Sequence, residues 1–170
     1  MIVCLTGFMG CGKSTVGRAL AERLGWEFVD LDAYVEHKKG CSIREIFERE
    51  GEEAFRAVEA ECIRDVIVMR QVAGGDVVVA LGGGTLSIRS VQPVILGQTV
   101  TVWLRRSLKS CLEEIAGEED SRPLLRSVPA AECLFSTREA DYSKSRFVID
   151  CDGKTYDSIT EEAAETVLNN

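Results

Sequence analysis

The sequence predicts an α/β fold in which a five-stranded parallel sheet lies between two layers of helices, a three-layer α/β/α sandwich. Short apolar runs alternate with segments of helical periodicity along most of the chain, as in right-handed strand–helix–strand crossovers. Residues 7–15, GFMGCGKST, stand between one such run and a helical segment. Residues 77–81, VVVAL, form a second run that ends in three glycines. Loops of these kinds at the carboxyl ends of parallel strands are typical of ligand-binding sites.

Length and composition limit the possible classes. The 170 residues suffice for one domain with a sizeable core, so we expect residues 1–170 to form a single domain. The net charge of −8 argues against nucleic acid as a partner, and no apolar run is long enough to span a bilayer. We expect no signal peptide, because a strand and a glycine-rich loop begin at once. The seven cysteines are scattered and odd in number, which favours free thiols in a reducing cytoplasm.

The first expected strand, residues 2–5, leads into the glycine-rich loop, and the helix that follows ends at Gly25. Glycines let successive backbone N–H groups turn toward an anion, and the helix adds the positive end of its dipole. Lys13 is placed to reach phosphates and Ser14 to offer a hydroxyl to Mg²⁺. A glycine-rich turn that only caps a helix is the alternative. The residues expected to bind the nucleotide here are Gly10, Cys11, Gly12, Lys13, Ser14 and Thr15.

Cys11 differs from the other cysteines because it lies inside this loop. A helix N-terminus lowers the pKa of a nearby thiol, so we expect Cys11 to be reactive. The alternative is a small residue that only fills the loop.

The second expected strand, residues 27–29, ends in two carboxylates one residue apart, Asp30 and Asp32. If strand geometry persists they point the same way, at the edge where ligands bind. The alternative is a solvated turn in which Asp32 caps a helix over residues 33–39.

The next segment reads as two helices. Ser42 to Glu45 forms a capping box, Gly51 breaks the helix, and a long helix runs from residue 52 to about 71. Arg56 lies on this long helix with glutamates at i−4 and i+3, so an ordinary surface salt bridge is the alternative to a functional role.

Residues 76–81 form the third expected strand, and the glycines 82–84 after it allow a very close approach of backbone to a neighbouring group. A helix distorted by Pro93 is expected over residues 87–97. The fourth strand covers residues 99–104, and a helix follows over residues 107–115.

Residues 116–127 are polar and lack periodicity, so we expect a surface loop that acts as a lid. A helix over residues 129–144 carries Arg138 and precedes the fifth strand, residues 146–150. A second capping box at Ser158 is expected to open the last helix.

Together these blocks resemble the shikimate kinase family over about residues 1–150, in order and at family-like spacing. Many nucleotide-binding proteins share the first block, but the combination is much more specific. The blocks are Gly10–Thr15, Asp30–Asp32, Ser42–Phe47, Phe55–Arg56, Gly82–Gly84, Arg122–Leu125, and Arg138 with Tyr142.

The resemblance implies a P-loop kinase fold similar to nucleoside monophosphate kinases, with strand order 2-3-1-4-5. It implies a substrate-binding region at about residues 32–60 and a lid at about 113–127. It also implies transfer of a phosphoryl group from ATP, with Mg²⁺, to the 3-hydroxyl of shikimate in aromatic amino-acid biosynthesis, by a monomer.

The resemblance also implies roles for individual residues. Asp32 holds the substrate hydroxyls, and a carboxylate there can accept the proton of the attacking hydroxyl. Asp30 orients water on the metal that Ser14 binds. Arg56 and Arg138 grip the substrate carboxylate, which suits their planar forks. Gly83 and Gly84 line the hydroxyl side, Lys13 offsets phosphate charge, and Arg122 enters with the lid and touches the transferring phosphate and the nucleotide.

The sequence departs from the family at two positions. The family arginine that lies against adenine, about seven residues before Arg122, corresponds here to Ile115. Tyr156 falls where the family has a proline in its adenine loop.

Other function classes remain open at this point. Gluconate kinase shares the phosphate loop but does not need two arginines and three glycines for a cyclic acid. A nucleotide-dependent switch that regulates a partner is a different class, although the sequence lacks the Asn-Lys-x-Asp pattern that reads guanine. An inactive homologue is a third possibility, and every expected catalytic position is filled.

Overall fold

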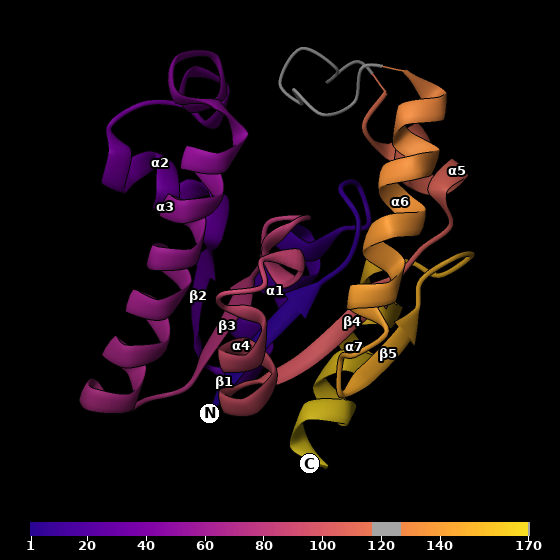
Figure 1. Ribbon diagram of the computed structural model, residues 1–170. Coiled ribbons are helices and arrows are strands. Elements are labelled where there is room, and N and C mark those ends of the chain that lie inside the picture. The colour runs from indigo at the N-terminus through magenta and orange to yellow at the C-terminus, as the bar shows by residue number, and fades with distance from the viewer. Residues whose placement is uncertain (117–126, 170) are drawn as a thin grey trace.

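The computed structural model describes residues 1–116 and 127–169. Its centre is a sheet of five strands in the order β2-β3-β1-β4-β5 (Figure 1). Every neighbouring pair runs parallel. The predicted fold class and strand order are therefore confirmed. The strands are β1 (Ile2–Thr6), β2 (Glu27–Asp30), β3 (Val77–Ala80), β4 (Val100–Arg105) and β5 (Phe147–Asp150).

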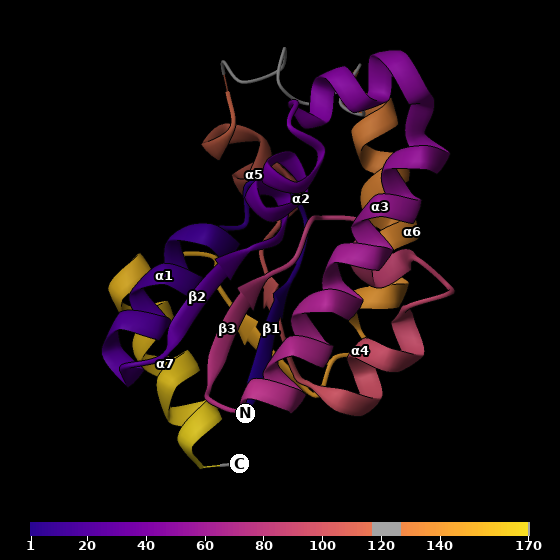
Figure 2. The ribbon, with the colours of Figure 1, turned by 90° about the vertical axis from the view of Figure 1, so that its left-hand side faces the viewer.

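Helices cover both faces of the sheet. Figure 2 shows α1 (Lys13–Leu24) and α7 (Tyr156–Leu168) on one face, where they pack against each other. The opposite face is covered by three helices: α3 (Ile43–Ala73), α4 (Gln92–Gln98) and α6 (Val128–Tyr142). The remaining helical elements are α2 (Leu31–Lys39), α5 (Leu108–Glu114) and the 3-10 turn η1 (Thr85–Ser87).

The central strands are buried on both sides, as expected for a parallel sheet covered twice. Every residue of β1 and β3 is buried, which explains their continuous apolar sequence. No helix in the described part of the chain is both long and apolar enough to cross a membrane.

The register of the strands determines where their loops meet. Leu5 of β1 and Asp30 of β2 both pair with Ala80 of β3. The segments that follow these three strands therefore start level with one another, at one edge of the sheet. They are the glycine-rich loop, the aspartate pair and the three glycines.

The structure corrects the expected start of α2. The helix begins at Leu31, and its N-cap is Asp30, whose side chain accepts hydrogen bonds from the amides of Asp32 and Ala33. Asp32 is therefore not the cap, because the last strand residue already supplies one. Asp32 lies in the first helical turn with its carboxylate free for another role.

Two further expectations about helix starts were wrong. The cap of α7 is Thr155, which accepts from the amide of Ser158, so the helix begins before the expected capping box. Pro93 lies in the first turn of α4, where its missing N–H costs nothing, and it starts that helix instead of distorting it. The expected break at Gly51 is confirmed: its φ of 85° interrupts the helical geometry of α3.

Candidate active site

The loops at this edge of the sheet surround a cavity of about 730 Å³. Its walls come from the segments after β1, β2 and β3, and from α3 and α6. Arg56 and Arg138 line it beside Gly84 and Gly83, and Ile115 and Tyr156 line it beside Gly10 and Gly12. The glycine-rich loop also lines the cavity.

The glycine-rich loop has the geometry of an anion cradle. Gly10 and Gly12 have φ values of 80° and 96°, a region that L side chains rarely adopt. Gly12 is the N-cap of α1, no side chain caps that helix, and its first turn holds no acidic residue. The amides there are thus available to an anion, with the helix dipole in support. The Nζ of Lys13 donates to the carbonyls of Gly7 at 2.9 Å and Phe8 at 3.1 Å, which holds the cation at the loop.

Thr15 also lines this part of the cavity, whereas Cys11 does not. The Cys11 side chain is fully buried, and its amide donates to the Phe8 carbonyl at 3.2 Å. The loop thus turns this thiol into the core, away from solvent. This burial argues against a reactive Cys11, and the reactivity stays a prediction for a labelling experiment.

Ser14 and Asp30 lie together at the start of α1. The Ser14 hydroxyl donates to the Asp30 carboxylate at 2.6 Å, so the cap of α2 also contacts the phosphate loop. A hydroxyl and a carboxylate side by side are the hard oxygen ligands that Mg²⁺ prefers.

Asp32 faces the same cavity, beside Glu59 and the first of the three glycines. The residue as a whole is exposed, but its carboxyl lies among protein groups at the cavity wall, against Gly82. Burial, together with the charge of Glu59, raises the pKa of Asp32 to about 6. Near pH 7 the carboxyl is mostly ionised and has an affinity for protons suited to a general base.

Arg56 is anchored by a buried carboxylate and is not part of an ordinary surface pair. Its guanidinium donates to Glu59 at 2.5 Å and to the exposed Glu52 at 3.4 Å. Glu59 is completely buried and also accepts a hydrogen bond from the hydroxyl of Thr85 at 2.5 Å. Because Thr85 begins η1, this chain of contacts ties α3 to the segment after β3.

Arg138 lies opposite on α6, only 4% exposed. Its guanidinium lies 5.9 Å from the centre of the Phe8 ring, and Nη1 has no hydrogen-bond partner among the described residues. Burial lowers the pKa of Arg138 from its ordinary value, although the group stays cationic. A buried cation with an unused donor is a site for an anionic ligand.

Each of the three glycines makes room for a charged side chain. A Cβ on Gly84 would lie 2.6 Å from Nη1 of Arg56, and one on Gly83 would lie 3.3 Å from Nη1 of Arg138. A Cβ on Gly82 would lie 2.8 Å from the Asp32 carboxylate. The close approach predicted from the sequence is thus an approach of the two arginines and the aspartate to this turn.

Sequence reasoning missed Arg106, which does not line the cavity itself but contacts Tyr156 and Glu114, which do. Its guanidinium lies 5.4 Å from the centre of the Tyr156 ring and 3.4 Å from Glu114. The Tyr156 hydroxyl in turn donates to Glu114 at 2.6 Å, and the buried Ile115 lies next to it. The available signal was that Arg106 follows the carboxyl end of β4, at the ligand-binding edge.

Arg122, predicted to enter with the lid, lies outside the described residues, as does most of the predicted lid at 113–127. The described part of that segment is the end of α5 with residues 115 and 116, and Ser127, the N-cap of α6.

Comparison with known proteins agrees with this geometry. The family model for shikimate kinase matches residues 9–168. A shikimate kinase of Geobacter sulfurreducens is 42% identical, covering 97% of this chain and 90% of the relative. One of Moorella thermoacetica is 40% identical over 97% of this chain and 93% of the relative. A shikimate kinase from Acinetobacter baumannii, solved in complex with shikimate, superposes with a TM-score of 0.89 at 29% identity, covering 99% of this chain and 93% of that one. Sequence, fold and site geometry thus agree that the chain belongs to the shikimate kinase family.

Proposed function

We propose that this chain transfers the terminal phosphoryl group of ATP to the 3-hydroxyl of shikimate, forming shikimate 3-phosphate for aromatic amino-acid biosynthesis. The observation that carries the proposal is that one cavity is lined by two arginines, by Asp32 and by the phosphate loop. A small hydroxy acid fits these groups, with its carboxylate on the arginines and its hydroxyl on Asp32, toward the phosphates.

The acid end belongs to Arg56 and Arg138. Arg56 is held by Glu59, and Arg138 keeps an unused N–H donor beside Gly83. A carboxylate accepts hydrogen bonds from both planar forks and restores the pairing of the buried Arg138. Gly83 and Gly84 complete this wall of the substrate site.

Asp32 acts as anchor and general base for the attacking hydroxyl. Its raised pKa of about 6 makes it a better proton acceptor than an ordinary aspartate while it stays ionised near neutral pH. Phosphoryl transfer depends mainly on such positioning and on charge stabilisation.

The nucleotide phosphates lie against Gly10, Cys11, Gly12, Lys13, Ser14 and Thr15. Backbone amides and Lys13 offset their negative charge, and the contribution of Cys11 is limited to its backbone because its thiol is buried. Mg²⁺, when bound, neutralises further phosphate charge. Ser14 would hold it directly and Asp30 through water, and their adjacent oxygens suit this ion.

The base of ATP occupies the end of the cavity at Ile115 and Tyr156. Arg106 lies over the Tyr156 ring, and the ring also lines the cavity, where aromatic rings stack nucleobases. Arg106 and Tyr156 thus replace the arginine and the proline that hold adenine in the family. The arginine comes here from the residue that follows β4.

The remaining expectations stay predictions. Arg122 is expected to stabilise the transferring phosphate, within a lid at about residues 113–127. We also expect a substrate region at about residues 32–60 within one domain, a monomer, and a cytoplasmic location.

A coupled assay of ADP release with three acceptor conditions tests the function. We expect ADP with shikimate, and neither with gluconate nor without an acceptor. Faster release with gluconate would assign the chain to another small-molecule kinase. Nucleotide binding without turnover of shikimate would favour a switch module.

A further inference from the structure

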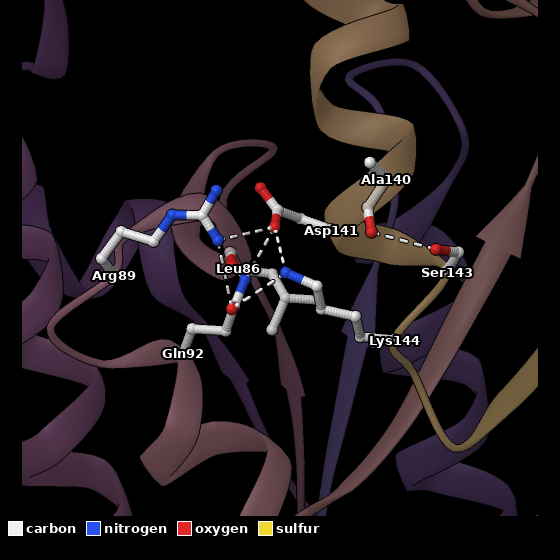
Figure 3. Close-up of polar contacts among 7 residues, drawn as sticks. All are labelled: Leu86, Arg89, Gln92, Ala140, Asp141, Ser143 and Lys144. Atoms are coloured by element: carbon white, nitrogen blue, oxygen red, sulfur yellow. Dashed lines mark hydrogen bonds and ion pairs between the residues drawn. The ribbon is translucent and has the colours of Figure 1, made fainter.

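A compact polar network lies behind the substrate wall, outside the groups used above (Figure 3). Its centre is Asp141 on α6, which is only 4% exposed. One carboxylate oxygen, Oδ1, accepts hydrogen bonds from Lys144 at 2.7 Å, Gln92 at 2.9 Å and Arg89 at 3.3 Å. The Gln92 amide also donates to the Leu86 carbonyl at 2.6 Å, and its own oxygen accepts from Lys144 at 3.1 Å. The buried amide therefore uses both of its ends.

This network connects three separate segments. Asp141 belongs to α6, Gln92 is the first residue of α4, and Leu86 lies in η1, directly after the three glycines. The next residue of α6, Tyr142, donates its hydroxyl to the carbonyl of Gly83. Two consecutive residues of α6 thus fasten the end of the helix to the glycine turn and to the segment behind it.

Arg138 lies three residues before Asp141 and four before Tyr142, one helical turn away on the same side of α6. The side chain of Arg138 forms no ion pair with a carboxylate in the described part of the chain, and its Nη1 has no partner. Glu59 holds Arg56 directly, whereas the hydrogen-bond partner of the Arg138 side chain is Tyr142 on the same helix, so the position of Arg138 follows the placement of α6.

The charge and the hydrogen bonds of this network hold its residues in one arrangement. Burial alone would raise the pKa of Asp141, but hydrogen bonds from Lys144 and Gln92 hold it below its ordinary value, so the group stays ionised at neutral pH. Removing one partner of such a buried group leaves the others unsatisfied, which costs more than the contact alone. The arrangement therefore favours one relative position of α6 and η1.

We propose that Asp141 is a positioning residue, which with Gln92 fixes α6 against the glycine turn and so sets where Arg138 meets the carboxylate of the substrate. The inference rests on the proposed role of Arg138. Asp141 does not touch the substrate itself, and the nucleotide end of the cavity lies on other elements.

The test is a double-mutant cycle with Asp141→Ala and Gln92→Ala, measured as KM for shikimate, KM for ATP and kcat. We expect each single variant to raise the KM for shikimate about tenfold, the size of losing one buried hydrogen-bonded partner. The KM for ATP should change less than about twofold. The double variant should resemble the singles, because residues in one network are not additive.

Val167→Ala is the matched control, because Val167 is buried in α7, on the opposite face of the sheet. It should lower the melting temperature through a cavity and leave the ratio of the two KM values unchanged. If Asp141→Ala does not fold, Lys144→Met replaces it, because Lys144 is a partly exposed donor to the same carboxylate and should raise the KM for shikimate at least about twofold.

An unchanged KM for shikimate in the folded variants, or equal changes of both KM values, would overturn the anchor. Arg138→Met separates this outcome from a failure of the proposed function. If Arg138→Met raises the KM for shikimate but the network variants do not, only the anchor fails. If Arg138→Met has no effect either, the role of Arg138 fails first.

Discussion

Asp30 and Asp32 show how neighbouring carboxylates of one type acquire different functions. One carboxylate oxygen of Asp30 accepts hydrogen bonds from the amides at the start of α2, and the other accepts from the Ser14 hydroxyl. Asp32 caps nothing and lies beside Glu59 in a setting that disfavours its charge. The sequence predicted the pair and its place at the sheet edge. Only the family resemblance divided the roles. The local pattern could not, because the division depends on which residue keeps extended geometry, and Asp30 does, with φ −90° and ψ 116°.

Asp32→Asn should lower kcat by roughly 10²–10⁴-fold, because an amide of nearly the same shape cannot accept the proton. Binding of ATP should persist, since the phosphate loop is untouched. The measurements are kcat and nucleotide affinity of the purified variant. An unchanged kcat would remove Asp32 from the chemistry.

The same residue gives a pH dependence whose sign follows from its raised pKa. The base must be ionised, so kcat of the native chain should fall as pH drops through about 6, and the residual activity of Asp32→Asn should not show this step. The folded chain binds this proton more tightly than the unfolded chain. Stability from this residue is therefore present at low pH and lost as pH rises through about 6. A melting temperature of Asp32→Asn at pH 7.5 that is equal to or above the native value would agree with this sign.

Cysteine chemistry should follow exposure and not position in the loop. Cys133 is exposed and Cys11 is fully buried. We expect one equivalent of iodoacetamide to label Cys133 first and to leave activity intact, as judged by peptide mass spectrometry and assay. Early labelling of Cys11, with ATP protecting, would contradict the buried thiol.

Among the helices and turns, the three glycines after β3 carry the most specific geometry. Their sequence predicted a close approach, and the structure identifies the groups that approach. The local pattern could not name Arg56 or Arg138, because these come from helices 28 positions before and 54 after Gly84. The contact of Arg106 with Tyr156, 50 positions apart, escaped prediction for the same reason. The start of α7 was missed for a local reason, since both Thr155 and Ser158 are good caps and only the fold selects one.

Gly84→Ala should weaken binding of shikimate by a factor of about ten, because the new Cβ displaces the Arg56 guanidinium. The backbone there is not strained, with φ −113°, so the fold should survive. The control is Gly97→Ala in α4, where a Cβ meets nothing within 4 Å. It should leave KM unchanged and stabilise the helix by roughly 0.5–1 kcal/mol. Equal KM values in the two variants would argue against the steric explanation.

For the chain as a whole, the ligand is expected to act as a cross-link between the two sides of the cavity. Arg56 is on α3 and Arg138 is on α6, and strands β3 and β4 lie between these helices in the sequence. Most of this arrangement was predictable from the sequence. The alternation of strands and helices determines a parallel α/β topology, and the loops after the strands mark its ligand-binding edge. The distances between the two helices were not, since they follow from packing over the whole face.

Shikimate at about 100 times its Kd should stabilise the folded chain by roughly 2.7 kcal/mol, which raises Tm by about 5–10 °C at this size. Arg138→Met should lose most of that shift and keep the shift caused by ATP. Thermal melts with each ligand measure both. Arg23→Ala, which breaks an exposed pair with Glu161, should retain both shifts.

Nη1 of Arg138 has no partner among residues 1–116 and 127–169, and this donor also acts as a filter against wrong ligands. A ring of the right size that carries hydroxyls but no carboxylate fills the cavity and excludes water, yet it leaves this buried N–H without an acceptor. Such a ligand lacks the contacts with the arginines. Its binding also carries a desolvation penalty of roughly 1–3 kcal/mol, because the buried N–H donor stays without an acceptor. Sites that demand a hydrogen bond reject the analogue that lacks it far better than apolar pockets reject an extra methylene. Selectivity for acids thus follows from the placement of one buried N–H donor, because only a ligand with an acceptor there satisfies it.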